Sequence, residues 1–139
     1  MIGPRDGRGL RARSLDELER SARRHPDARV ASARSRPLAA LDAADLRLLL
    51  ARRQGLAHVL PLAVALLADD PFVEACGHPG DLLCALCGLE RAEWTGDAPL
   101  RLAWLAVLHG AWSARDLAAT HDRERIERAV EAARRRGLA

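Results

Sequence analysis

The segment from residue 57 to residue 68 constrains the fold more than any other part of the chain. Its large apolar side chains are Val59, Leu60, Leu62, Val64, Leu66 and Leu67, so a helix built on it has no polar face. Such a helix must be covered by other elements on most of its sides. The apolar stretch also contains His58 and Pro61 and is too short to cross a bilayer. It therefore predicts a central helix around which the rest of a globular domain packs.

The clearest amphipathic helix is predicted from residue 42 to residue 54. Its apolar stripe consists of Leu46, Leu49 and Leu50. Asp42 is placed to cap the first turn, and Gly55 is the expected C-terminal stop. In the apolar helix that follows, Pro61 is expected in the first turn or so, where no backbone N–H is needed.

Further helices complete the predicted architecture. They run from the Ser14/Glu17 capping box to about residue 24, from 82 to 89, from Asp97-Ala-Pro99 onward, and from Ser113 to Arg136, with Gly137 as the stop. Residues 27–37 are expected to form a loop. No β-alternation persists anywhere in the sequence. We therefore predict an all-α fold of about five or six helices, with a flexible basic tail at 1–13 and a single helical domain at 14–139.

Charge is distributed unevenly along the chain. All 22 basic residues are arginines, a bias typical of a GC-rich genome, so arginine content alone does not indicate nucleic-acid binding. Residues 1–36 contain ten arginines and five acidic residues. Residues 37–90 contain three arginines and seven acidic residues, and residues 91–139 contain nine arginines and seven acidic residues. Within the acidic middle third, Asp69, Asp70, Glu74 and Asp81 fall in one short window. Asp69 and Asp70 end the apolar helix at the negative pole of its dipole, which is an unfavourable position and indicates another role.

Residues of the types that bind metals or carry out catalysis form no convincing constellation. Cys76, His78, Cys84 and Cys87 have a spacing that zinc could use, but Cys84 and Cys87 fit better as small apolar residues of a helix. The other histidines are scattered, and no phosphate-binding glycine loop is present. Three cysteines cannot all pair, which favours reduced thiols in a cytoplasm. We expect no catalytic residue, no metal and no cofactor.

Residues 42–69 also have to be weighed as a DNA-binding helix-turn-helix. In such a module the second helix enters the major groove with polar and basic side chains. Here that helix is apolar throughout and offers only His58, which argues against groove entry. The basic stretch 123–136 alternates both signs of charge and is typical of a solvated helix face.

Two segments of the middle of the chain carry a family resemblance. The first contains Pro37-Leu38, Leu41, Asp45-Leu46-Arg47, Leu49 and Gly55-Leu56, and the second Leu60-Pro61-Leu62-Ala63, Leu66, Asp70-Pro71, Glu74 and Pro79-Gly80-Asp81-Leu82-Leu83. With these motifs, residues 14–89 resemble the immunity proteins of bacterial contact-dependent growth inhibition (CDI) systems. Where that family has Gly-Asp-x-Tyr, this chain has Ala75-Cys76-Gly77-His78, with one acid and one aromatic residue fewer.

The resemblance implies an all-helical cytoplasmic protein without enzymatic activity. Such a protein binds the C-terminal toxin domain of a delivered effector and blocks its active site; these toxins are commonly nucleases of basic character. The partner is then the cognate toxin domain, and neither a membrane nor a specific nucleic acid is expected. Carboxylates that imitate phosphates would favour association with a basic nuclease. On this basis the expected toxin-binding residues are Asp69, Asp70, Glu74, His78 and Asp81, although Asp81 is equally placed to cap the helix that follows.

The alternative function is that of a small helical nucleic-acid-binding regulator that uses its arginine-rich surfaces. If the acidic segment is not the binding site, the arginine-rich N-terminal third and the tryptophan-bearing region 94–112 are the next candidates.

Overall fold

The computed structural model describes residues 7–94 and 98–138. Within these residues the chain forms eight α-helices, three short 3-10 helices and no β-strand. The α-helices are α1 (Gly7–Arg11), α2 (Leu15–Leu18), α3 (Ala28–Ser35), α4 (Ala43–Ala51), α5 (Leu56–Asp69), α6 (Asp81–Cys87), α7 (Ala98–Ser113) and α8 (Thr120–Arg135). The 3-10 helices are η1 (Leu38–Ala40), η2 (Arg91–Glu93) and η3 (Arg115–Leu117). The all-α prediction is confirmed, and the number of helices exceeds the predicted five or six because several short segments are helical.

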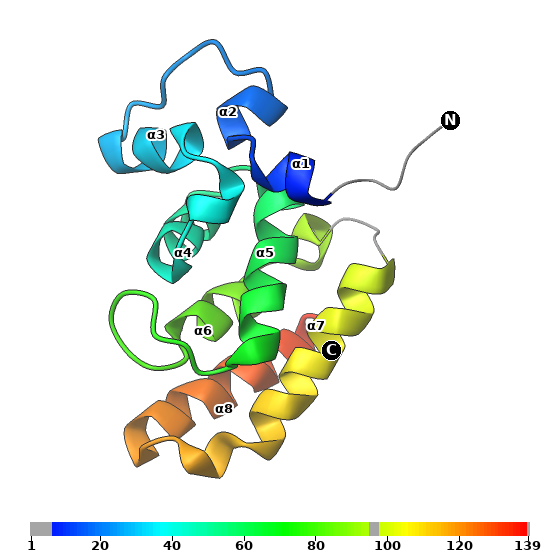
Figure 1. Cartoon of the computed structure of the whole chain (residues 1–139). Coiled ribbons are helices and arrows are strands. Elements are labelled where there is room, and N and C mark those ends of the chain that lie inside the picture. Colours follow the sequence, from blue (N-terminus) through cyan, green and yellow to red (C-terminus); the bar gives the residue numbers. More distant parts are fainter. Residues whose placement is uncertain (1–6, 95–97, 139) are drawn as a thin grey trace.

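Helix α5 is the central element, as its composition predicts. It packs against α4 on one side and α7 on the other (Figure 1). Val59, Leu60, Ala63, Val64 and Leu67 of this helix are buried. None of the helices that the structure describes is both long and apolar enough to span a membrane.

A second layer is formed by α6 and α8. These helices pack against each other, and α6 also contacts α4 (Figure 1). Leu82, Leu83 and Leu86 on α6 and Ile126 and Val130 on α8 are fully buried. One hydrophobic cluster joins both layers and extends from Leu15 in α2 to Leu138 after α8.

Two predicted boundaries in the N-terminal part are wrong. Residues 27–37, predicted as a loop, contain α3, which Asp27 caps by accepting hydrogen bonds from Arg29 and Val30 N–H at 2.9 and 3.4 Å. The helix predicted to reach residue 24 is a single turn, α2, which ends where Arg20 adopts a left-handed φ of 50°. The pattern obscured α3 because Val30 is its only large apolar residue.

The last helix begins later than predicted. Ser113, predicted to open it, is the final residue of α7, and α8 starts at Thr120 after the short η3. The apolar sequence of α7 remains helical up to Ser113. Leu117, in the connection between α7 and α8, is 86% exposed. Gly137 ends the chain's last helix as predicted, with a left-handed φ of 76°. The predicted cap Asp97 lies outside the described residues, and so do residues 1–6 of the predicted tail 1–13. Within that tail, Gly7–Arg11 form α1.

The connection between α4 and α5 differs from the prediction in two details. The residue after the C-cap of α4 is Arg53, with φ 53°, and its N–H donates to Leu50 O. Gly55, predicted as the stop, instead precedes α5 with φ 61°, and a Cβ there would lie 2.7 Å from Leu15 Cδ2. Pro61 is the sixth residue of α5 and not part of its first turn. The Ala57 carbonyl therefore lacks the helical N–H partner that residue 61 would otherwise provide.

Candidate functional site

We call residues 69–81 the acidic loop: they comprise the segment that connects α5 to α6, the last residue of α5 (Asp69) and the first residue of α6 (Asp81). It is folded on itself, because Gly80 N–H donates to Phe72 O at 3.0 Å and Val73 N–H donates to Asp70 O at 3.3 Å. Phe72, Val73 and Ala75 are partly buried against the hydrophobic core. The acidic loop therefore has a defined shape and presents its outward side chains from a fixed backbone.

Asp81 holds the acidic loop from the inside. Its carboxylate accepts hydrogen bonds from three consecutive backbone N–H groups, those of Ala75 at 2.6 Å, Cys76 at 2.9 Å and Gly77 at 2.8 Å. The residue is only 2% exposed. Burial acts to raise the pKa of the Asp81 carboxyl, but the backbone hydrogen bonds from Ala75, Gly77 and Cys76 outweigh it and lower the pKa below the ordinary value.

The expectation that Asp81 caps α6 is wrong. Gly80 occupies the cap position in a left-handed conformation with φ 82°, and Asp81 is the first residue of the helix. A Cβ at Gly80 would lie 3.2 Å from Ile126 Cδ1 of α8, so the chain turns into α6 in a place with little room for a side chain. The carboxylate of Asp81 is directed back to the loop because three adjacent N–H groups there have no helical partner.

An arginine from α4 approaches the same carboxylate. Arg47 Nε lies 3.8 Å from Asp81 Oδ2, which is an ion-pair distance and not a hydrogen bond. Through this pair and the hydrogen bonds of Asp81, α4, α6 and the acidic loop are joined at one point.

The outward side of the loop carries uncompensated negative charge. Asp69, Asp70 and Glu74 are exposed, and within the described residues none of them has an ion-pair partner. Asp70 is exposed, and its Oδ1 accepts a hydrogen bond from Phe72 N–H at 3.0 Å. Most other acids pair with arginine; these are Asp16, Glu17, Glu19, Asp27, Asp45, Glu93, Asp116, Asp122 and Glu127. Glu124 and Glu131 on α8 also lack an ion pair among the described residues.

The cysteines and His78 do not converge. His78 is half-buried and its Nδ1 lies 3.0 Å from the carbonyl oxygen of its neighbour Pro79. Cys76 is exposed, while Cys87 is buried, and this burial together with the nearby Cys84 raises the pKa of Cys87 to about 12. Across the described ranges, no three His, Cys, Asp or Glu side chains are grouped so that they could hold a metal ion.

The five predicted binding residues thus divide into two kinds. Asp69, Asp70 and Glu74 are exposed on the acidic loop and His78 is half-exposed there, so all four are accessible to a partner. Asp81 lies behind them, where it fixes the loop backbone.

Sequence reasoning missed a buried arginine at the other end of the molecule. Arg34 of α3 is 7% exposed and donates to Asp16 Oδ1 at 2.9 Å and to Gln54 Oε1 at 3.1 Å. It also forms an ion pair with Glu19 at 2.7 Å. The signal was present, since Arg34 follows Val30 at a spacing of four and so lies on the buried face of a helix, but the segment had been predicted as a loop.

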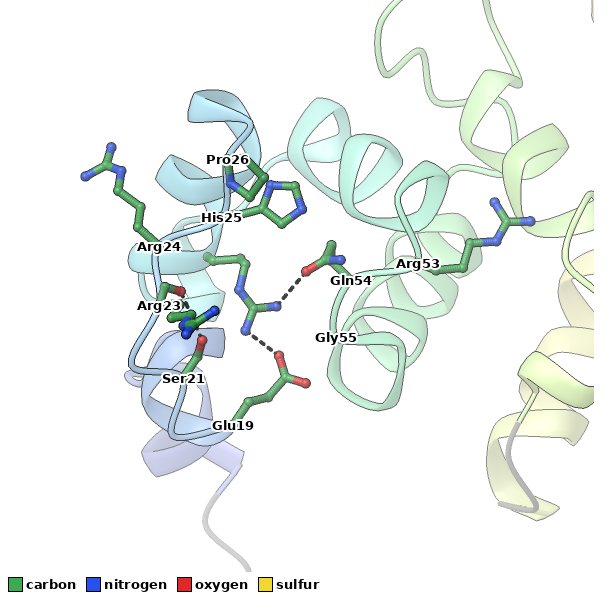
Figure 2. A pocket seen from close by; sticks show the side chains of 10 residues that line it. Glu19, Ser21, Arg23, Arg24, His25, Pro26, Arg53, Gln54 and Gly55 are labelled. Carbon is green, nitrogen blue, oxygen red and sulfur yellow. Dashed lines mark hydrogen bonds and ion pairs between the residues drawn. The ribbon is translucent and has the colours of Figure 1, made fainter.

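An open cavity of about 590 Å³ lies beside this arginine. Figure 2 shows Glu19, Ser21, Arg23, Arg24 and His25 along one wall and Arg53, Gln54 and Gly55 along the other. Two of the dashed contacts in Figure 2 are those of Arg34 with Glu19 and Gln54, and they connect the turn after α2 to the turn before α5.

Comparison with known protein families gives a match over most of the chain. Residues 13–102 match the model of the CDI immunity proteins. No curated protein and no solved structure gives a significant match. The matched range contains the acidic loop, the Arg47–Asp81 pair and Arg34 with all of its partners. The family comparison therefore agrees with the resemblance carried by the sequence motifs, and the chain belongs to the family of CDI immunity proteins.

Proposed function

We propose that this protein binds and neutralises the toxin domain of a contact-dependent growth inhibition effector, and that the toxin is a nuclease of basic character. The observation that carries the proposal is the group of three exposed carboxylates, Asp69, Asp70 and Glu74, which have no cation within ion-pair distance in the described part of the chain. A nuclease presents positive charge to bind phosphates, so an ordered row of carboxylates is complementary to its active site.

The construction of the acidic loop supports a binding role. An interface segment that is already ordered loses less conformational entropy when it binds. Asp81 supplies that order through hydrogen bonds to Ala75, Cys76 and Gly77 N–H. Asp69 and Asp70 also stand at the negative end of the α5 dipole, where a basic partner would offset both the dipole and the like-charge crowding.

We further propose that inhibition is stoichiometric and without catalysis, and that it takes place in the cytoplasm. Membership of an immunity-protein family supports both points. The competing function, a nucleic-acid-binding regulator, finds less support in the fold. Helix α5 would be the recognition helix of a helix-turn-helix, and it is covered by α4 and α7.

The test is the rate of association between the purified protein and its cognate toxin domain at several salt concentrations. The double variant Asp69→Asn/Asp70→Asn should associate about tenfold more slowly at low salt and show a flatter salt dependence, because long-range attraction is lost. The matched control is Glu124→Gln/Glu131→Gln, which removes the same charge from exposed positions on α8.

Equal rates for the wild type and the Asp69/Asp70 variant at every salt concentration would refute the proposed site. Equal losses in both double variants would show that only net charge matters and not the acidic loop. Sub-micromolar, salt-sensitive binding to DNA or RNA in a gel-shift titration would favour the regulator instead.

A further inference from the structure

A second, smaller cavity lies between η2, the start of α7 and the end of α8. Its volume is about 70 Å³, and it is lined by Arg91, Trp94, Arg101, Trp104, Gly137 and Leu138. The polar side chains in this lining are two indoles and two guanidinium groups. All of them donate hydrogen bonds and none accepts.

The two indoles are buried donors without acceptors. Trp94 and Trp104 stack with their ring centroids 5.0 Å apart and an interplanar angle of 24°. They are 8% and 1% exposed, and neither Nε1 has a hydrogen-bond partner within residues 7–94 and 98–138. Leaving a buried N–H unpaired is costly, and most buried indole N–H groups find an acceptor. Both rings line the cavity, so its wall contains two indoles whose N–H donors are unpaired among the described residues.

The two arginines give the cavity a positive charge. Within the described residues neither Arg91 nor Arg101 forms an ion pair with a carboxylate. Arg91 Nη1 lies 3.6 Å from the position that a Cβ on Gly137 would take, so its guanidinium covers the end of α8. Nearby, the Arg136 guanidinium donates to Cys87 O at 2.8 Å and adds a further positive charge without neutralising the others.

The size of the cavity limits what it can hold. With a volume of about 70 Å³, the cavity has room for a small ion or a few waters and is far too small for a nucleotide. The polar side chains of the lining are all donors, both indole N–H groups are unpaired among the described residues, and neither arginine there has a carboxylate partner. From these observations we infer that this cavity binds a small anion of chloride or carboxylate size. A bound anion would connect η2 and the start of α7 to the end of α8, which lies far from both in the sequence. This inference is independent of the proposed toxin binding.

The experiment titrates the purified full chain with sodium formate or sodium chloride while sodium pivalate keeps the ionic strength constant. The tert-butyl group of pivalate is attached directly to its carboxylate and is too bulky for the cavity. We expect a saturable change in tryptophan fluorescence with formate or chloride. At about ten times the dissociation constant, the folding equilibrium shifts about tenfold, which raises the unfolding midpoint by about 3 to 6 °C. A stronger response to formate identifies a carboxylate site, and a stronger response to chloride a halide site.

The double variant Arg91→Gln/Arg101→Gln should lose this response. The control Arg128→Gln/Arg135→Gln removes two exposed arginines of α8 that have no ion pair in the described residues, and it should respond as the wild type does. The inference is overturned if formate and chloride act no differently from pivalate. It is also overturned if the Arg91/Arg101 variant keeps the response, or if both double variants lose it equally.

Discussion

Arg47 Nε and Asp81 Oδ2 lie 3.8 Å apart and join α4 to the first residue of α6. Both residues belong to the motifs by which the chain resembles its family, Asp45-Leu46-Arg47 and Pro79-Gly80-Asp81. Their contact shows what these motifs do in the fold. Asp81 organises the acidic loop, Arg47 supports Asp81, and Asp45 forms a capping box with Asp42 and an ion pair with Arg36 at 2.6 Å. The exposed acids of the loop are thus displayed by a structure that the motif residues build.

The first prediction concerns the carboxylate of Asp81. Asp81→Asn should lower the free energy of unfolding by about 1 to 3 kcal/mol, because one of its oxygens becomes an amide that faces backbone N–H donors. Urea denaturation measures the change. Asp69→Asn is the control and should leave stability unchanged or slightly higher, since it removes an exposed negative charge from the C-terminal end of α5. An unchanged unfolding free energy in Asp81→Asn would show that the loop does not depend on this carboxylate.

The second prediction is the pH dependence that follows from the lowered pKa of Asp81. A carboxyl whose folded-state pKa lies below its unfolded value stabilises the fold above the unfolded pKa, and this stabilisation disappears as the pH falls through the folded pKa. The ordinary value is 3.8, so the stabilisation by Asp81 should be present above about pH 4 and should decline progressively as the pH falls from there through the lower folded-state pKa. Unfolding curves measured between pH 2 and 7 should therefore converge for the wild type and Asp81→Asn at the acid end. If the difference in stability between the wild type and Asp81→Asn stayed constant from pH 2 to pH 7, the stabilising role of the Asp81 carboxylate would be contradicted.

The third prediction concerns Arg34. Arg34→Lys should cost about 1 to 3 kcal/mol of stability, because a single ammonium group cannot reach Asp16, Glu19 and Gln54 in the geometry that the planar guanidinium satisfies. Arg24→Lys is the matched control: it is the same substitution at an exposed position on the rim of the neighbouring cavity, and it should be neutral. Urea denaturation measures the stability of both variants. The prediction is contradicted if Arg34→Lys, like Arg24→Lys, has the stability of the wild type.

The fourth prediction compares two glycines. Gly55→Ala should destabilise the protein by about 1 to 3 kcal/mol, because φ is +61° and the new Cβ would lie 2.7 Å from Leu15 Cδ2 in the core. Gly110→Ala should instead be neutral or stabilise by about 0.5 to 1 kcal/mol, because the glycine lies within α7 and a Cβ there meets nothing within 4 Å. The measurement is the thermal unfolding midpoint of each variant. If the two midpoints shifted in the same direction and by the same amount, the predicted difference between the two glycines would be contradicted.

Local sequence patterns are sufficient to predict the fold class, the central helix and the segment that carries the exposed acids. These features follow from local patterns: the apolar run of α5, the stripe of Leu46, Leu49 and Leu50 in α4, the cap at Asp42, and the motifs from Pro37 to Leu83. Periodicity and capping are properties of neighbouring residues, so they can be read before the chain is folded.

The roles of Asp81, Arg34, Gly55 and the tryptophans become visible only in the folded chain. Asp81 was expected to cap its own helix, but six residues of loop fold back so that three N–H groups point to its carboxylate. Gly55 was expected to end α4, but the reason for a glycine there is the side chain of Leu15, forty residues earlier in the sequence. The donor-only cavity likewise depends on Trp94, Trp104 and Leu138, which come together from separate elements. Such roles are set by contacts between distant segments, and no local pattern encodes them.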